Sequence, residues 1–174
     1  MRHVVLVGLM GSGKTTVGSA IADALGWPLR DSDPDLRAAT GRSARQIAAD
    51  DGIDALHDLE RDHLLDALAD PAPSVICAAA SVIDEPAVRD ALRDPSVLVV
   101  WLRVAAGTAA RRMSSTDHRP RPEAIEAQAT RRDPWFAAVA DLTIDADTPA
   151  DGGFRPVDDL VEEILDRVRV EPLG

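Results

Sequence analysis

Gly8-Leu9-Met10-Gly11-Ser12-Gly13-Lys14-Thr15-Thr16 is the stretch that decides the fold of this 174-residue chain. It matches the phosphate-binding pattern G-x-x-x-x-G-K-[ST] without a mismatch. The glycines allow consecutive backbone N–H groups to turn inward, where they can bind phosphate oxygens. The pattern therefore predicts a phosphate-binding loop. The predicted nucleotide contacts are Gly11, Ser12, Gly13, Lys14, Thr15 and Thr16.

Both flanks of this loop agree with the prediction. Residues 3–7 form a short β-branched apolar run that is typical of a buried strand. From residue 15 to residue 25 the apolar positions fit one face of a helix, and Gly26 follows as a stop. The helix adds the positive end of its dipole to the loop. The Lys14 ammonium would then reach the outer phosphates, and the Thr15 hydroxyl would ligate Mg²⁺.

Length and composition indicate one acidic domain. We expect a single domain over residues 1–174, because this length suffices for one hydrophobic core. A net charge of −11 makes nucleic acid and anionic membranes unsuitable partners. The single cysteine, Cys77, excludes a disulfide framework and fits a reducing compartment. His3, His63 and His118 share no metal-ligand spacing, and we expect them to be solvated.

The first apolar run bears on the location of the protein. It is too short to span a membrane, and it continues directly into the phosphate-binding loop. We therefore expect neither a membrane span nor a signal peptide, and we expect a cytoplasmic monomer.

Strands and helices alternate along the rest of the chain. Further strands are expected at residues 27–30, 74–77, 97–102 and 140–144. Helices are expected at about 33–40, 43–52, 53–68, 85–92, 105–113, 123–138 and 157–168, with an interruption near Pro134. The helix at 43–52 starts with a capping box of Ser43 and Gln46. This alternation predicts an α/β fold with a parallel sheet covered on both faces. Ligands of such sheets bind beyond the carboxyl ends of the strands, where the loop also lies.

The absence of certain residues narrows the class of phosphate-binding protein. The chain contains no Asn, so it lacks the Asn-Lys-x-Asp motif by which GTPases recognise guanine. Neither of the strands at 74–77 and 97–102 ends in an acidic residue, where many ATPases hold their metal. Asp31 and Asp33 follow the neighbouring strand, and we expect at least one of them to hold metal or act in catalysis. The alternative is a solvated turn in which Asp33 caps a helix.

Arginine gathers in and around a proline-bounded segment. Arg111-Arg112 end one helix, Arg119-Pro120-Arg121 lie in a loop, and Arg131-Arg132 lie near the end of the next helix. A mobile loop that carries Arg can stabilise the charge of phosphoryl transfer and exclude water. We expect such a lid at about residues 113–122. The alternative is an ordinary Arg-rich surface, because Lys14 is the single lysine among 19 Lys and Arg residues.

With these motifs in place, the chain resembles the shikimate kinase family over nearly its whole length. The likeness runs through residues 8–18, 31–33, 40–43, 47, 59–60, 119–120, 132–136 and 140–145. It implies a three-layer P-loop kinase fold of the nucleoside monophosphate kinase type. That fold has a five-stranded parallel sheet flanked by helices and a small Arg-bearing lid. The likeness also implies ATP, Mg²⁺ and transfer of the γ-phosphoryl group to a hydroxyl of a small polyol acid.

The resemblance assigns roles on the nucleotide side. Asp31 would help Thr15 to hold Mg²⁺, acting through water. Arg119 would reach over the transferring phosphate and would be catalytic together with Lys14. The adenine would be sandwiched between Arg112 and Pro156.

On the acceptor side, the resemblance implies that Asp33 binds the acceptor hydroxyl and acts as base, while Arg132 pairs with a carboxylate. Two acceptor positions depart from the family. His57 stands where the family has a second Arg, and a largely neutral imidazole cannot make a bidentate fork. Ala78-Ala79-Ala80 stand where the family has three glycines. Their methyl groups would narrow the pocket, with Ala79 lining it, and would cause strain wherever φ must be positive.

These departures lead us to expect a kinase of a small hydroxylated metabolite other than shikimate. Three alternatives stay open. The first is an authentic shikimate kinase that tolerates the changes. The second is a nucleotide-binding protein without kinase activity, and the third is a kinase of a natural product. A simpler explanation of the departures is that His57 is a surface residue and the three alanines only fill space in the packing.

Overall fold

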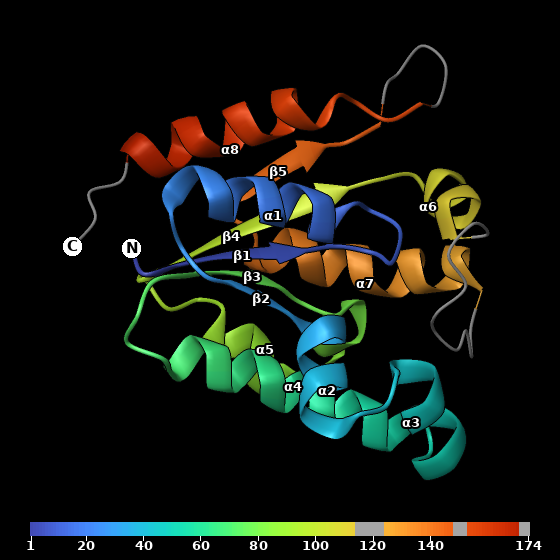
Figure 1. Ribbon diagram of the computed structural model, residues 1–174. Coiled ribbons are helices and arrows are strands. Elements are labelled where there is room, and N and C mark those ends of the chain that lie inside the picture. Colours follow the sequence, from blue (N-terminus) through green and yellow to red (C-terminus); the bar gives the residue numbers. More distant parts are fainter. Residues whose placement is uncertain (114–123, 148–152, 171–174) are drawn as a thin grey trace.

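A five-stranded sheet forms the centre of the computed structural model, which describes residues 1–113, 124–147 and 153–170 (Figure 1). Every strand pair in it is parallel, and the strand order is β2-β3-β1-β4-β5. The strands are β1 His3–Val7, β2 Leu29–Asp31, β3 Ser74–Cys77, β4 Val97–Arg103 and β5 Leu142–Asp145. The α/β fold with a five-stranded parallel sheet is thereby confirmed.

Strand β1 lies in the middle of the sheet because its residues suit burial on both faces. All five of its residues are buried, and it pairs with β3 on one side and β4 on the other. Central strands of parallel sheets are covered on both faces and therefore read as continuous apolar runs. The carboxyl end of β1 leads straight into Gly8, so the phosphate-binding loop starts at the centre of the sheet edge.

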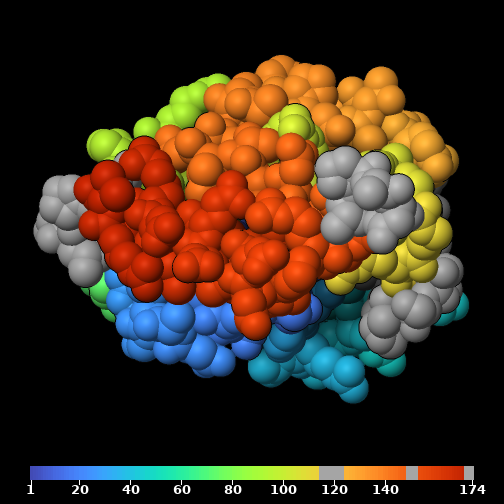
Figure 2. Space-filling view, turned by 90° about the horizontal axis from the view of Figure 1, so that it is seen from above, coloured from blue at the N-terminus to red at the C-terminus, as the bar shows by residue number. Residues whose placement is uncertain are grey.

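Helices cover both faces of the sheet in three layers (Figure 1). Helices α1 (Lys14–Leu25) and α8 (Val157–Val170) pack together on one face. The space-filling view shows α8 on the outer surface beside α1 (Figure 2). The other face is covered by α4 (Ile53–Ala69), α5 (Pro86–Ala91) and α7 (Ile125–Val139). No helix among the described residues is both long and apolar enough to cross a membrane.

The remaining helices lie near the carboxyl edge of the sheet (Figure 1). They are α2 (Ser32–Thr40), α3 (Ala44–Asp51), the 3₁₀ helix η1 (Ala80–Asp84) and α6 (Ala106–Met113). Helices α2 and α3 pack against α4 around a small separate core. Ser43 and Gln46 form the predicted capping box at the start of α3, with reciprocal hydrogen bonds of 3.2 and 2.8 Å.

Two helix boundaries differ from the sequence prediction. Helix α2 begins at Ser32, so Asp33 lies in its first turn and is not its N-cap. Asp31 holds the N-cap position, but its side chain bonds to Thr15 and caps nothing. Helix α7 continues through Pro134, where an interruption was expected. Helix α7 packs against η1 and β4, and this tertiary packing offsets the hydrogen bond that the proline cannot make.

Helix α1 approaches the sheet closely at Gly18. A Cβ atom there would lie 2.3 Å from Cys77 Sγ and 3.1 Å from Leu6 Cδ1. We expect Gly18→Ala to lower the free energy of unfolding by about 1–3 kcal/mol. The overpacking would outweigh the gain of about 1 kcal/mol in helix propensity that Ala brings over Gly. Urea-induced unfolding followed by circular dichroism measures the difference.

Gly107→Ala in α6 is the matched control. A Cβ atom at Gly107 would meet nothing nearer than Arg111 Nη1 at 3.7 Å. The free energy of unfolding should therefore stay level or rise by up to about 1 kcal/mol. A Gly18→Ala protein as stable as the wild type would show that α1 can shift to make room.

Candidate active site

The phosphate-binding loop joins the end of β1 to the start of α1 and has glycines with positive φ angles at three positions, Gly8, Gly11 and Gly13. Gly11 and Gly13 adopt φ angles of 81° and 93°, which L-residues rarely take. A Cβ atom at Gly11 would lie 2.7 Å from the carbonyl oxygen of Ala109, and one at Gly13 would lie 2.9 Å from the Phe154 ring. The surroundings of the loop thus leave no room for a side chain at Gly11 or Gly13.

Lys14 and Ser12 place polar groups at this loop. The Lys14 ammonium donates hydrogen bonds to the carbonyl oxygens of Gly8 at 2.8 Å and Leu9 at 2.9 Å. The Ser12 hydroxyl is buried and has no hydrogen-bond partner in the part of the chain that the structure describes. A loop with an ammonium, an orphaned hydroxyl and backbone N–H groups at the positive end of a helix fits an anionic phosphate chain.

Thr15 and Asp31 form the link between α1 and β2. The Thr15 hydroxyl donates a 2.6 Å hydrogen bond to Asp31 Oδ2, and the Asp31 side chain is buried. A hydroxyl and a carboxylate are the hard oxygen ligands that Mg²⁺ prefers, and Mg²⁺ usually takes few ligands from the protein. The described residues contain no cluster of three or more His, Cys, Asp or Glu with metal-binding geometry. The pair therefore fits Mg²⁺ held jointly with nucleotide phosphates and water.

Asp33 lies two residues after Asp31, half-buried in the first turn of α2. A network that sequence reasoning missed fixes this helix. Asp35 accepts a 3.0 Å hydrogen bond from Arg30 Nε, and its Oδ2 lies 2.7 Å from His63 Nε2 on α4. Burial acts to raise the pKa of Asp35, but the hydrogen bonds from His63 and Arg30 outweigh it and lower the pKa. The network therefore locks α2, and with it Asp33, onto α4.

The expectation that His3 and His63 are solvated is wrong. Both are buried, and each makes hydrogen bonds through its ring. His3 lies between the Ser74 hydroxyl and the Asp70 carbonyl oxygen, at 2.9 and 3.1 Å. For His63 the signal was present, because it shares the buried face of α4 at helical spacing with Leu56, Glu60, Leu64 and Ala67.

Helix α4 and the segment after β3 carry residues that the resemblance places on the acceptor side of the candidate site. Glu60 is 2% exposed and accepts a hydrogen bond from the Ser81 hydroxyl, which joins α4 to η1. His57 lies one turn earlier on the same helix and is half-buried. The three alanines after β3 are buried. The backbone strain expected there is absent, because no described non-glycine residue has a positive φ. Ala79 sits at φ −61° and ψ 147°, which is ordinary extended backbone.

Arg132 reaches this side of the site from α7 and is already engaged there. Its Nε lies 3.1 Å from both carboxylate oxygens of Asp84, and its Nη2 lies 2.7 Å from Asp84 Oδ2. Its Nη1 donates a 2.8 Å hydrogen bond to Gln128 Oε1. Asp84 is the last residue of η1, and nothing in the sequence pointed to it.

Arg112 lies beside the loop with Phe154, two residues before Pro156, and the resemblance places adenine between Arg112 and Pro156. The Arg112 guanidinium lies over the Phe154 ring at 3.9 Å from its centroid, and both side chains lie next to Gly13. Pro156 is exposed two residues further on, just before α8. Phe154 was not predicted as a site residue. The roles of Arg112 and Pro156 stay predictions.

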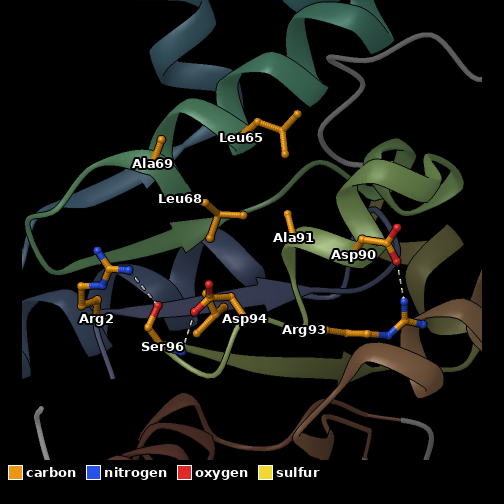
Figure 3. Close-up of a pocket in the computed structure, with 10 residues that line it drawn as sticks. Arg2, Leu65, Leu68, Ala69, Asp90, Ala91, Arg93, Asp94 and Ser96 are labelled. Atoms are coloured by element: carbon orange, nitrogen blue, oxygen red, sulfur yellow. Dashed lines mark hydrogen bonds and ion pairs between the residues drawn. The ribbon is translucent and has the colours of Figure 1, made fainter.

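The proposed lid and Arg119 lie outside the described residues, apart from Met113 at the end of α6. The pocket in Figure 3 belongs to another part of the molecule. It measures about 390 Å³ and lies between α4, α5 and the chain around Arg2 and Ser96, at the amino ends of β1 and β4. Ligands of parallel sheets bind at the opposite edge, so this pocket is not part of the candidate site.

A family model described as shikimate kinase matches residues 10–169 of the chain. The chain belongs to the shikimate kinase family. The shikimate kinase of Mycobacterium tuberculosis (strain ATCC 25177 / H37Ra) is 35% identical over 172 residues, which cover 95% of this chain and 93% of that relative. The shikimate kinase of Caulobacter vibrioides (strain NA1000 / CB15N) is 40% identical over 119 residues. Those residues are 68% of this chain and 58% of the Caulobacter relative.

Solved structures agree with the family. A shikimate kinase from Acinetobacter baumannii in complex with shikimate is 26% identical and superposes with a TM-score of 0.87, covering 100% of this chain and 96% of that one. The shikimate kinase from Aquifex aeolicus, at 24% identity, TM-score 0.78 and 99% coverage of both chains, supports the fold alone. These comparisons do not support the expectation of an acceptor other than shikimate. They favour the alternative of an authentic shikimate kinase.

The Cys77 thiol, at the end of β3, is expected to be unreactive in the folded protein. It is buried and donates a 3.2 Å hydrogen bond to the Lys14 carbonyl oxygen. Burial, and after it the Asp31 carboxylate, raises the pKa of the thiol, whereas reaction needs the thiolate. Labelling of Cys77 by an aromatic disulfide at pH 8 should be at least about 100-fold slower in the folded protein than in urea-unfolded protein. In the folded protein the reagent reaches the thiol only after local opening of the structure. Equal rates in the two states would contradict this packing.

Proposed function

We propose that this chain is a shikimate kinase, which uses ATP and Mg²⁺ to phosphorylate a hydroxyl of shikimate. The observation that carries the proposal is the Thr15–Asp31 hydrogen bond beside the phosphate-binding loop and Lys14. It is supported by the family match over residues 10–169 and by the likeness to a shikimate kinase in complex with shikimate.

On the nucleotide side the chain supplies charge and shape. The backbone N–H groups of the loop and the start of α1 would bind phosphate oxygens. The Lys14 ammonium would exchange its two carbonyl partners, Gly8 and Leu9, for the outer phosphates. Thr15 and Asp31 would hold Mg²⁺, which neutralises charge on the phosphates when it is bound. Arg112, Pro156 and the neighbouring Phe154 ring would enclose the adenine.

On the acceptor side the chain supplies a base and cationic contacts. The Asp33 carboxylate would accept a hydrogen bond from the acceptor hydroxyl and take its proton. Arg132 and the half-buried His57 would contact the acceptor carboxylate, with Ala79 against the ring. Arg119 would stabilise the transferring phosphate from a lid at about residues 113–122. Phosphoryl transfer needs little more than such positioning and charge stabilisation.

We also propose that the chain works as a single domain in the cytoplasm and as a monomer. Its expected partner is a small hydroxylated acceptor. The net charge of −11 argues against nucleic acid and anionic membranes.

Shikimate-dependent ADP formation, with mass spectrometry of the phosphorylated product, tests the proposed function. We expect turnover of shikimate by the purified chain. Lys14→Ala should lower kcat by about 10²–10³ while the circular dichroism spectrum stays unchanged, because a donor to the transferring phosphate is lost. The matched control is Arg93→Ala, which removes an exposed cation at the amino edge of the sheet.

Two results would contradict the proposal. One is a wild-type chain that binds ATP but transfers no phosphate to shikimate. The other is a Lys14→Ala variant with normal turnover. A parallel panel of sugar acids, polyols and aminocyclitols would show whether another acceptor takes the phosphoryl group.

A further inference from the structure

The side chain of Asp84 meets Arg132 in the way a bound carboxylate would. Nε and Nη2 of Arg132 both lie within 3.1 Å of the Asp84 carboxylate, and Nη1 is taken by Gln128. Arg131 adds a weaker contact of 3.3 Å to Asp84 Oδ2. A planar guanidinium can bind a carboxylate along either of two edges, one formed by Nε and Nη2 and the other by Nη1 and Nη2. Asp84 occupies the first edge of Arg132, and Gln128 occupies Nη1 of the second, so a second carboxylate would need nitrogens that are already engaged.

The backbone around Asp84 is fixed from two sides. Arg89 of α5 donates hydrogen bonds of 2.6 and 2.9 Å to the carbonyl oxygens of Ile83 and Asp84, and its guanidinium lies 4.0 Å from the centroid of the Trp135 ring of α7. At the other end of η1, Ser81 is bonded to the buried Glu60. Because both ends of η1 are anchored, the position of the Asp84 side chain next to Arg132 is fixed.

The charges of the pair agree with this geometry. Arg132 is 5% exposed, so its cation depends on a close anionic partner. Burial acts to raise the pKa of Asp84, but the hydrogen bond and the charge of Arg132, with Arg131, outweigh it and lower the pKa below its usual value. Asp84 is therefore ionised at neutral pH and competes with any other anion for Arg132.

We propose that Asp84 is a specificity-determining residue: an internal carboxylate that occupies Arg132, so that an acceptor carboxylate must displace it. This inference rests on the proposed function in taking Arg132 as the contact for the acceptor carboxylate. Its consequence is a weaker apparent affinity for acidic acceptors. The apparent dissociation constant rises by the inverse of the fraction of molecules in which Arg132 is available. His57, which is not a permanent cation, offers little compensation on the same side of the site.

A contrasting role for Asp84 would be to orient Arg132 for the acceptor. The two roles predict opposite effects of Asp84→Asn, which keeps the shape of the side chain and removes its charge. If Asp84 occupies Arg132, the variant binds shikimate more tightly. If Asp84 only orients Arg132, the variant binds shikimate more weakly.

Isothermal titration of shikimate into the wild type and Asp84→Asn measures this directly. We expect the dissociation constant to fall roughly tenfold in the variant. This is the change expected if Asp84 occupies Arg132 in about nine wild-type molecules of ten. The methyl ester of shikimate lacks the charge and should bind both proteins equally. Asp90→Asn is the matched control, because it removes a carboxylate from an exposed pair with Arg93 on the remote side of α5. It should leave binding unchanged.

Asp84→Ser is the second variant and decides the matter if Asp84→Asn does not fold. Unchanged or weaker shikimate binding in the folded variants would overturn the inference, as would a complete lack of binding in every variant. Turnover is scored separately. A wild type that fails to phosphorylate shikimate contradicts the proposed function, and tighter binding in Asp84→Asn would still support the occupation of Arg132.

Discussion

The hydrogen bond from the Thr15 hydroxyl to Asp31 is the interaction on which the rest of the site depends. It joins the first turn of α1, which follows β1, to the end of β2. In the sheet, β3 lies between β1 and β2. Asp31 leads directly into α2, so the same contact sets the position of Asp33 in the first turn of that helix. In the proposed function, phosphate binding on one side and acceptor binding on the other are thus tied to this one part-buried hydrogen bond.

The parts of this molecule that sequence predicted are those governed by local rules. The loop from Gly8 to Lys14 is encoded by a spacing of glycines and by a strand and helix next to it, and it was found completely. The five parallel strands follow from apolar runs between helical patterns. The capping box at Ser43 depends on residues three positions apart. Each of these features involves neighbours in the chain, and one sequence carries that information.

The rest depends on residues that meet only in the folded chain. Asp84 pairs with Arg132 across 48 positions, and Asp35 pairs with His63 across 28. No pattern in one sequence specifies such partners. The expectation of a different acceptor arose from two departures, His57 and the three alanines Ala78–Ala80, which were judged by substitution alone. The alanine segment has ordinary backbone angles. What remains distinctive on the acceptor side is charge, with His57 and Asp84 where an acidic ligand would be held.

The central claim is that Thr15 and Asp31 together hold the metal for phosphoryl transfer. Its most direct test is the Mg²⁺ dependence of ATP turnover by wild-type protein and Asp31→Asn, with shikimate and ATP at saturating concentration. The account predicts that the half-saturating Mg²⁺ concentration rises by about tenfold or more, because a charged oxygen ligand is lost. An unchanged half-saturating concentration in a folded variant would contradict it, since Asp31 would then act on the fold of the loop and not on the metal.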